Sequence, residues 1–226
     1  MKRIFISLLL TSLMATASMA QRLSVSVLGD SYSTYEGFVE PESNRIWYHQ
    51  VPDTAKTDVS SVRQTWWHRL VTESGLKLER NNSYSGATVC NTGYKGKDYS
   101  DRSFVKRMKD LGRPDIIIIL GATNDSWAHS PVGDYKFSDW TDADLYSFRP
   151  AMAYMLATMK DYYPGTPIYF VLNANLSDDI DTSVQSICTR YAVPVIELKD
   201  IDCRAGHPTV KGMEQIAQQV KEGIGL

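Results

Sequence analysis

The chain has 226 residues, of which 43% are hydrophobic, and a formal charge of −2 from 24 basic and 26 acidic side chains. This weak negative charge argues against nucleic acid as the main partner. The length suits one domain with a sizeable core, and no linker rich in Pro, Gly or Ser and no repeat divides the chain.

The first 20 residues have the pattern of a cleavable export signal. Lys2 and Arg3 precede a mostly apolar stretch, and Ser18-Met19-Ala20 has the small-x-small pattern of a cleavage site. The apolar stretch is too short for a membrane span. We therefore expect a secreted or periplasmic domain over residues 21–226, with 22 basic and 26 acidic residues and a formal charge of −4. Because Gln21 is not a cysteine, we expect no lipid anchor.

A strand pattern ends directly before the most informative serine of the chain. Every second residue from Leu23 to Val27 is apolar, Gly29 permits a sharp turn, and Ser31 follows. The pattern predicts a largely buried strand whose end presents Ser31 as a nucleophile. A serine hydroxyl is a weak nucleophile by itself, so this interpretation requires a base and an oxyanion site elsewhere.

The next part of the chain is irregular before it becomes regular again. Residues 34–62 are rich in Tyr, Pro, Asp, Ser and Asn without a sustained period, which predicts a long surface excursion. A helix is expected over residues 61–73, with one of Trp66 and Trp67 in the core and the other at its edge. A strand over residues 76–82 then leads to Gly86, which alone would be read as a turn glycine.

The run from Asp115 to Leu120 is the least ambiguous element of the sequence. Its continuous β-branched residues predict a central parallel strand covered on both faces. Asn124 and Asp125 follow it, and alone they would be expected only to cap a helix. The other expected elements are helices over 103–111, 142–162 (kinked or begun by Pro150), from the acidic start 177–181 to 191, and 209–224, with strands over 167–172 and 194–197.

Strands that alternate with helices predict a three-layer α/β/α sandwich around a doubly wound, five-stranded parallel sheet. The carboxyl ends of the strands in such a sheet lie at one edge, where ligands bind. Ser31, Gly86, Asn124 and His207 all follow predicted strands and meet at this edge. The serine supplies a nucleophile and the histidine a base, while the Ser31 N–H, the Gly86 N–H and the Asn124 amide suit an oxyanion.

The blocks Gly29-Asp30-Ser31-Tyr32-Ser33, Gly86, Thr123-Asn124-Asp125 and His207-Pro208 resemble, in this order, the four blocks of the SGNH hydrolase superfamily, also called GDSL esterases and lipases. The resemblance runs from Leu23 to the final helix. It implies a flavodoxin-like sheet and hydrolysis of carboxylic esters without a cofactor. It also implies Ser31 as nucleophile, His207 as base, and Gly86 and Asn124 as oxyanion donors.

Two positions depart from the family's pattern. The residue two before Asn124 is Ala122, where the family usually has glycine. The family commonly places an aspartate three residues before its histidine, and this sequence has Arg204 there. Asp202 is the first candidate to orient the His207 imidazole. The alternative is a Ser-His dyad in which a backbone carbonyl holds the ring.

The remaining histidines and the cysteines are weaker candidates for chemistry. His49, His68 and His129 compete as bases, and His129 is placed to line the pocket, but only His207 follows the last strand. Three cysteines allow at most one internal disulfide, and Cys188 with Cys203 is the expected pair. Without a Cys-x-x-Cys or a close histidine pair, no metal site is expected.

The leading interpretation is an exported serine esterase that removes a short acyl group, such as acetyl, from a carbohydrate or related ester. The carbohydrate part rests on export and on aromatic residues near the expected mouth. The alternative is a non-catalytic carbohydrate-binding protein on the same fold, which Arg204 favours and the four site residues oppose. We expect no nucleic-acid partner and no stable membrane insertion, and the oligomeric state stays open.

Overall fold

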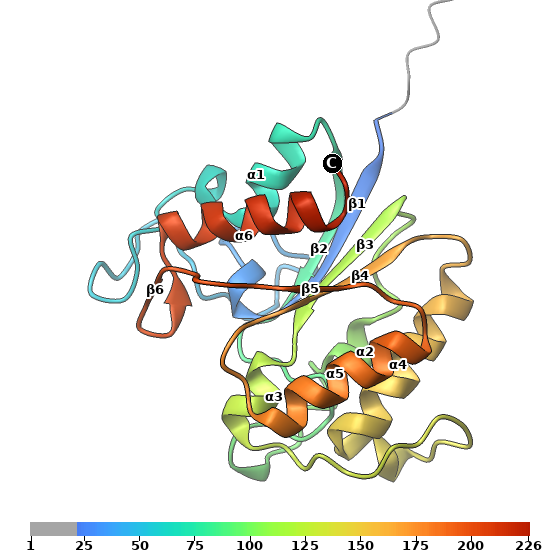
Figure 1. Ribbon diagram of the computed structural model, residues 1–226. Coiled ribbons are helices and arrows are strands. Elements are labelled where there is room, and N and C mark those ends of the chain that lie inside the picture. The colour runs from blue at the N-terminus through green and yellow to red at the C-terminus, as the bar shows by residue number, and fades with distance from the viewer. Residues whose placement is uncertain (1–21) are drawn as a thin grey trace, which may run out of the picture.

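The computed structural model describes residues 22–226, in which a five-stranded sheet lies between two layers of helices (Figure 1). The expected signal peptide falls outside these residues. The strand order is β2-β1-β3-β4-β5, and all the pairings are parallel. The predicted fold class is therefore confirmed. The strands are β1 (Ser24–Gly29), β2 (Lys77–Ser83), β3 (Ile116–Gly121), β4 (Ile168–Leu172) and β5 (Val195–Glu197).

Alternate residues of the central strand β3 enter the two apolar layers of the core. Ile117 and Ile119 pack in one layer, and Ile118 and Leu120 pack in the other. All four are fully buried, and burying such a side chain stabilises the fold by about 1.5–3 kcal/mol. Coverage on both faces is the reason why this strand is a continuous apolar run instead of an alternating one.

The helices divide between the two faces of the sheet (Figure 1). One layer contains α1 (Trp66–Glu73) and α6 (Val210–Gly223), and the opposite layer contains α2 (Phe104–Arg107), α4 (Phe148–Tyr162) and α5 (Asp178–Arg190). The smaller elements are α3 (Thr123–Ala128), the 3-10 turns η1 (Ser31–Ser33), η2 (Val62–Gln64), η3 (Tyr94–Gly96) and η4 (Asp142–Tyr146), and the ribbon strands β6 (Cys203–Arg204) and β7 (His207–Pro208).

Two expected helices are each divided by one extended residue. The expected helix over 61–73 is a 3-10 turn followed by α1, because Thr65 is extended at φ −70° and ψ 148°. The expected helix over 142–162 breaks at Ser147, so that α4 begins at Phe148. Pro150 therefore lies in the first turn of α4, where its missing N–H leaves no helical bond unmade.

Both tryptophans of α1 are buried, so the prediction that one of them lies at the edge of the core was wrong. Trp66 is 0% exposed and Trp67 is 2% exposed. The irregular segment over residues 34–62 also contributes to the core, because Tyr48 and Val59 are fully buried. The Tyr48 hydroxyl donates to the Pro208 carbonyl oxygen at 2.9 Å. The segment expected to be a surface excursion therefore packs against the ribbon that carries His207.

The expected disulfide between Cys188 and Cys203 is wrong, since Cys90, Cys188 and Cys203 are all free thiols. Cys188 is a buried residue of α5 in the apolar core, whereas Cys203 is an exposed residue of β6. Burial raises the pKa of Cys188 to about 12, so this thiol stays protonated. The acidic stretch 177–181 begins α5, as predicted.

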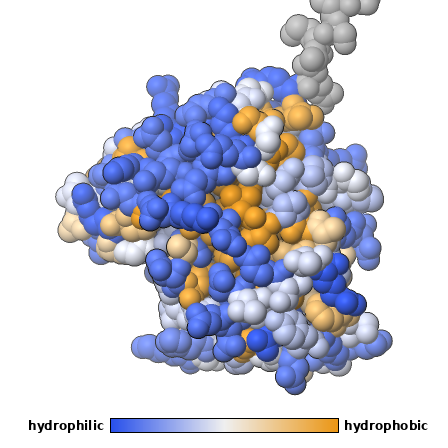
Figure 2. Space-filling view, viewed as in Figure 1, coloured by the Kyte–Doolittle hydropathy of each residue, from blue (hydrophilic) through white to orange (hydrophobic). Residues whose placement is uncertain are grey.

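The outer surface over α6 is hydrophilic, while apolar side chains gather in the band beside β5 (Figure 2). β5 forms one edge of the sheet and has only three residues. A short edge strand offers little backbone to another chain. Among residues 22–226, no helix combines the length and the apolar character needed to cross a membrane.

Candidate active site

Ser31 lies immediately beyond the carboxyl end of β1, at a turn that only glycine permits. A Cβ at Gly29 would lie 2.5 Å from the Ser83 hydroxyl and 2.6 Å from Ser33, so a side chain has no room there. The Asp30 carboxylate then accepts the Tyr32 N–H at 3.0 Å and starts the 3-10 turn. This local structure places Ser31 at the sheet edge with 4% of its surface exposed.

His207 lies on a two-stranded ribbon, opposite Arg204. Ala205 and Gly206 between them have φ values of 48° and 74°, as in the tight turns of β-hairpins. His207 Nε2 lies 2.9 Å from Ser31 Oγ, and His207 Nδ1 lies 3.2 Å from the Ala205 carbonyl oxygen. Because a carbonyl oxygen only accepts, Nδ1 carries the hydrogen and the Nε2 lone pair faces the serine.

Asp202 does not face the imidazole. Its carboxylate accepts the Thr209 hydroxyl, and its carbonyl oxygen accepts the Thr209 N–H at 3.0 Å. Gly212 packs so closely that a Cβ there would lie 2.1 Å from the same carbonyl oxygen. Asp202 is thus attached to the start of α6. Arg204, at the position where an aspartate was sought, donates to the Thr54 carbonyl oxygen at 3.3 Å. The structure therefore has the alternative arrangement, in which a backbone carbonyl, that of Ala205, contacts the imidazole ring.

Aromatic rings surround the His207 imidazole. Trp47 stacks on it with ring centroids 3.6 Å apart and planes 7° apart, and Tyr32 and Trp127 approach it at 5.4 and 6.2 Å. Only 7% of His207 is exposed. Burial lowers its pKa to about 4, so the imidazole is neutral at physiological pH. No local sequence pattern links Trp47 to His207, which is why this contact was missed.

The two expected oxyanion donors are beside Ser31. Gly86 has a φ of 84°, a left-handed conformation that favours glycine, and its N–H has no hydrogen-bond acceptor among residues 22–226. Asn124 is the second residue of α3. Its Oδ1 accepts the Tyr94 hydroxyl at 2.8 Å, and its Nδ2 donates to Asp30 at 3.4 Å, which leaves one N–H for a ligand. Ser31, Gly86, Asn124 and His207 line one cavity of about 230 Å³.

Two buried carboxyl groups, those of Asp30 and Asp125, lie next to Ser31 and Asn124 in the chain. Burial raises the pKa values of Asp30 and Asp125 to about 7. Asp125 accepts the N–H groups of Val89 and Cys90 at 2.8 and 3.2 Å. Asp125, expected only as a helix cap, therefore joins α3 to the loop that follows Gly86.

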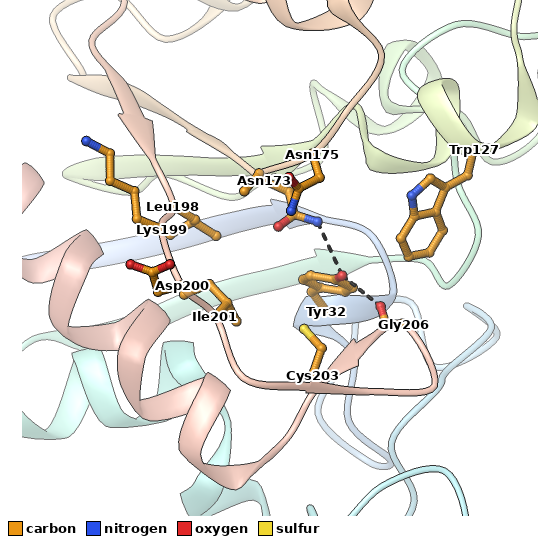
Figure 3. Close-up of a pocket in the computed structure, with 11 residues that line it drawn as sticks. Tyr32, Trp127, Asn173, Asn175, Leu198, Lys199, Asp200, Ile201, Cys203 and Gly206 are labelled. Carbon is orange, nitrogen blue, oxygen red and sulfur yellow. Dashed lines mark hydrogen bonds between the residues drawn. The ribbon is translucent and has the colours of Figure 1, made fainter.

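A second cavity of about 550 Å³ lies beyond the ends of β4 and β5 (Figure 3). Trp127, which is 40% exposed, lines both cavities. In Figure 3 the Tyr32 ring lies between Trp127 and the loop with Lys199 and Asp200. Asn173 donates to the Tyr32 hydroxyl at 3.2 Å, and this hydroxyl donates to the Gly206 carbonyl at 2.8 Å. The wall of the second cavity is therefore hydrogen-bonded to the turn that precedes His207.

The other histidines do not line the cavity that contains Ser31. His49 is exposed beside Glu36, and His68 lies in α1, where burial lowers its pKa. His129 is an exposed residue at the end of α3, so the expectation that it lines the pocket was wrong. Within the described part of the chain, no three His, Cys, Asp or Glu side chains are gathered to hold a metal ion.

The sequence profile of a family described as GDSL-like lipase/acylhydrolase matches residues 23–224. A solved structure from Bacteroides ovatus, described as a GDSL-like lipase, has 57% sequence identity and a TM-score of 0.88, and the match covers 90% of this chain and 98% of that one. A similarly described structure from Bacteroides uniformis has 52% identity and a TM-score of 0.87, with coverage of 90% and 95%.

A family two carbohydrate esterase from Clostridium thermocellum, solved in complex with cellohexaose, shares the fold at 15% identity and a TM-score of 0.57. The match covers 91% of this chain and 66% of that one. Comparison with curated proteins finds no match.

Proposed function

Because the chain belongs to the GDSL-like lipase/acylhydrolase family and is an ester-hydrolysing enzyme, we propose that Ser31 and His207 form its catalytic dyad and that it removes short acyl groups from a carbohydrate ester. The observation that supports the dyad most directly is the 2.9 Å contact between Ser31 Oγ and His207 Nε2. A nucleophile and base within hydrogen-bond reach, with the base oriented by a third group, is the arrangement that serine acyl transfer requires.

In the first half of the reaction, Ser31 Oγ bonds to the ester carbonyl carbon while its proton moves to His207 Nε2. The carbonyl oxygen becomes an oxyanion. When this intermediate collapses, the bond to the alcohol oxygen breaks and Nε2 returns the proton to the leaving alcohol. The Ala205 carbonyl accepts from Nδ1–H throughout and stabilises the imidazolium less than a carboxylate would.

In the second half, a water molecule attacks the acyl-serine. His207 Nε2 takes one proton of this water and then returns it to Ser31 Oγ as the carboxylic acid leaves. The Ser31 N–H, the Gly86 N–H and the free N–H of Asn124 bind the oxyanion in both halves. Removing one such donor typically lowers the rate by about 10²–10³.

Two features support a short acyl group and a sugar alcohol. The cavity with Ser31 has a volume of about 230 Å³, which leaves little room for a long chain. The adjoining cavity of about 550 Å³ is lined by the polar side chains of Asn173, Asn175 and Asp200 and by Trp127. An aromatic face beside hydrogen-bonding side chains suits a sugar ring, which has apolar faces and a polar rim.

Export belongs to the same proposal. Residues 1–20 have the charged start, apolar centre and small-residue end of a secretory signal. We expect the mature protein outside the cytoplasm to begin at Gln21. Sequencing of its N-terminus tests this, and an intact N-terminus at Met1 in the exported fraction would contradict it.

Hydrolysis of 4-nitrophenyl acetate by the mature chain tests the dyad. We expect Ser31→Ala and His207→Ala to lose nearly all activity, with the fold intact by circular dichroism, because neither retains a nucleophile and base together. Asp161→Ala, at an exposed residue of α4, is the matched control and should behave as the parent. Full activity in Ser31→Ala would disprove the mechanism.

A fluorophosphonate probe provides a second readout that does not depend on the substrate. The probe bonds covalently to a serine only when a base activates it. Labelling of the parent at Ser31, and its loss in His207→Ala, is expected. An unlabelled parent would instead favour the carbohydrate-binding alternative.

A further inference from the structure

Two arginines and no carboxylate line the cavity that contains Ser31. Arg45 and Arg102 belong to its wall together with Ser31, Gly86 and Asn124, and none of the described residues that line it is Asp or Glu. The chain as a whole has a formal charge of −2. Asp101 pairs with Arg102, so Arg45 is the cation of this cavity that has no ion pair within residues 22–226. The adjoining cavity differs, because it pairs a lysine with an aspartate.

Arg45 is held at the cavity by its backbone. Its carbonyl oxygen accepts the Ser85 N–H at 2.7 Å, directly before Gly86. The preceding Asn44 donates to Asn82 at 3.1 Å and to the Ser83 carbonyl at 3.2 Å. These bonds fix the backbone while the Arg45 side chain stays exposed and makes no ion pair within residues 22–226. Its guanidinium is therefore available to a ligand.

The Arg102 guanidinium contacts aromatic rings and one carboxylate, but not all of its N–H groups have hydrogen-bond partners. It lies 4.6 Å from the centre of the Tyr99 ring and 5.5 Å from that of Tyr84. Asp101 accepts from its Nε at 2.7 Å and from its Nη2 at 2.9 Å. Its Nη1 has no partner in the described part of the chain, so this edge of the guanidinium remains free to donate.

We propose that the ester substrate carries a carboxylate, which Arg45 and the free Nη1 of Arg102 bind while the ester carbonyl lies against Ser31. This proposal rests on the proposed role of Ser31. A guanidinium matches a carboxylate with parallel, charge-assisted N–H bonds. Esters of acidic sugars and half-esters of dicarboxylic acids share this chemistry, and they differ in whether the alcohol or the acyl part carries the charge.

Two matched pairs of esters distinguish these cases. 4-Acetoxybenzoate and its methyl ester differ by a charge on the alcohol part. 4-Nitrophenyl hydrogen adipate and 4-nitrophenyl hexanoate differ by a charge on the acyl part. The measured quantity is the ratio of kcat/KM for the charged member to kcat/KM for the neutral member, which cancels changes in general activity.

We expect Arg45→Gln and Arg102→Gln each to lower this ratio about tenfold in one of the two pairs, as the loss of one hydrogen bond to a charged group implies. Arg45→Lys keeps the positive charge but loses the pair of parallel guanidinium N–H bonds, so its ratio should lie between those of Arg45→Gln and the parent. Arg113→Gln is the matched control, because Arg113 is an exposed arginine before β3, at the opposite edge of the sheet. Ratios in Arg45→Gln and Arg102→Gln equal to those of Arg113→Gln in both pairs would overturn the proposal.

A binding measurement tests the carboxylate site even if Ser31 is not the nucleophile. In Ser31→Ala, calorimetry should show that 4-acetoxybenzoate or adipate binds more weakly, by about tenfold, when Arg45→Gln is added. The affinity should also fall as salt rises, because the contact is partly exposed. If the parent lacked esterase activity but showed this Arg45-dependent binding, the catalytic role of Ser31 would be refuted and the carboxylate site would not. Equal binding with and without Arg45→Gln would refute the carboxylate site.

Discussion

The neutrality of His207 follows from what touches its ring. Trp47 covers one face at 3.6 Å, and the partner of Nδ1 is a neutral carbonyl instead of a carboxylate. Burial disfavours the imidazolium, and no adjacent charge offsets this, so the pKa falls from 6.5 to about 4. The proposed base is therefore able to accept a proton at a pH where an ordinary histidine is already charged.

The first prediction is an acid-tolerant pH profile. Because the base must be neutral, kcat/KM for 4-nitrophenyl acetate should fall at acid pH with a midpoint near the His207 pKa of about 4. Trp47→Ala admits water to the imidazole and should move this midpoint towards 6.5. Circular dichroism at each pH excludes unfolding.

Trp140→Ala is the control for the Trp47 variant, since Trp140 is a partly buried tryptophan whose ring contacts Tyr154 of α4 instead of His207. Its acid midpoint should equal that of the parent. The same midpoint in Trp47→Ala would show that the stacked indole does not set the pKa.

The second prediction concerns Tyr94 as a positioning residue. Its hydroxyl donates to Asn124 Oδ1 at 2.8 Å, which directs the amide nitrogen towards the oxyanion. Tyr94→Phe should lower kcat by about tenfold and leave KM nearly unchanged, a part of the roughly 10²–10³ that a whole donor contributes. Tyr162→Phe, at an exposed tyrosine, serves as the control. A raised KM with an unchanged kcat would instead assign Tyr94 to substrate binding.

Among the elements, the junction between the ribbon and α6 decides which group orients His207. Thr209 caps α6 by accepting the Gly212 N–H at 3.2 Å, and it donates to the Asp202 carboxylate. The ribbon turn then directs the Ala205 carbonyl at Nδ1. Asp202 thus stabilises the start of α6, while the Ala205 backbone carbonyl orients the proposed base, His207.

The third prediction separates these two roles of Asp202. Asp202→Ala should lower the free energy of unfolding by about 0.5–1.5 kcal/mol, the usual value of one hydrogen bond. It should leave kcat for 4-nitrophenyl acetate within about threefold of the parent. If Asp202 oriented the imidazole, kcat would fall far more, since loss of a triad aspartate can cost about 10⁴. Urea denaturation and steady-state kinetics on the same variant measure both quantities.

At the scale of the whole molecule, a buried arginine joins the elements that meet beneath the active site. Arg107 of α2 donates to the carbonyl oxygens of Gly29 at 3.2 Å, Asn82, and Arg102 at 2.8 Å. These carbonyls belong to the end of β1, to β2 and to the loop before α2. Burial lowers the pKa of Arg107 to about 9, and the nearby Asp30 opposes this shift. The Arg107 guanidinium therefore joins the elements that lie beneath Ser31.

The fourth prediction follows from this arrangement. Arg107→Ala should lower the free energy of unfolding by about 3–5 kcal/mol, because it leaves buried carbonyl oxygens without donors and Asp30 without its neighbouring cation. Arg113→Ala, at an exposed arginine, should change it by less than about 0.5 kcal/mol. Urea denaturation of the three proteins measures this. A small effect in Arg107→Ala would mean that water replaces the guanidinium.

The sequence by itself determined the elements and the fold class, because these depend on local and periodic properties. The continuous apolar run of β3 and the glycine that ends β1 can be recognised from the sequence without a structure. The same reasoning brought Ser31, Gly86, Asn124 and His207 to one edge, since parallel strands share their carboxyl ends. It did not detect the breaks at Thr65 and Ser147, where single residues leave the helical region.

Only the tertiary structure decided what surrounds the base. Trp47 on His207, the Ala205 carbonyl at Nδ1 and the attachment of Asp202 to Thr209 are contacts that depend on how loops pack. The free cysteines are of the same kind, because pairing requires proximity that residue spacing does not give. Periodicity specifies which face of an element is buried, whereas the partner of a polar atom depends on distances between segments far apart in the chain.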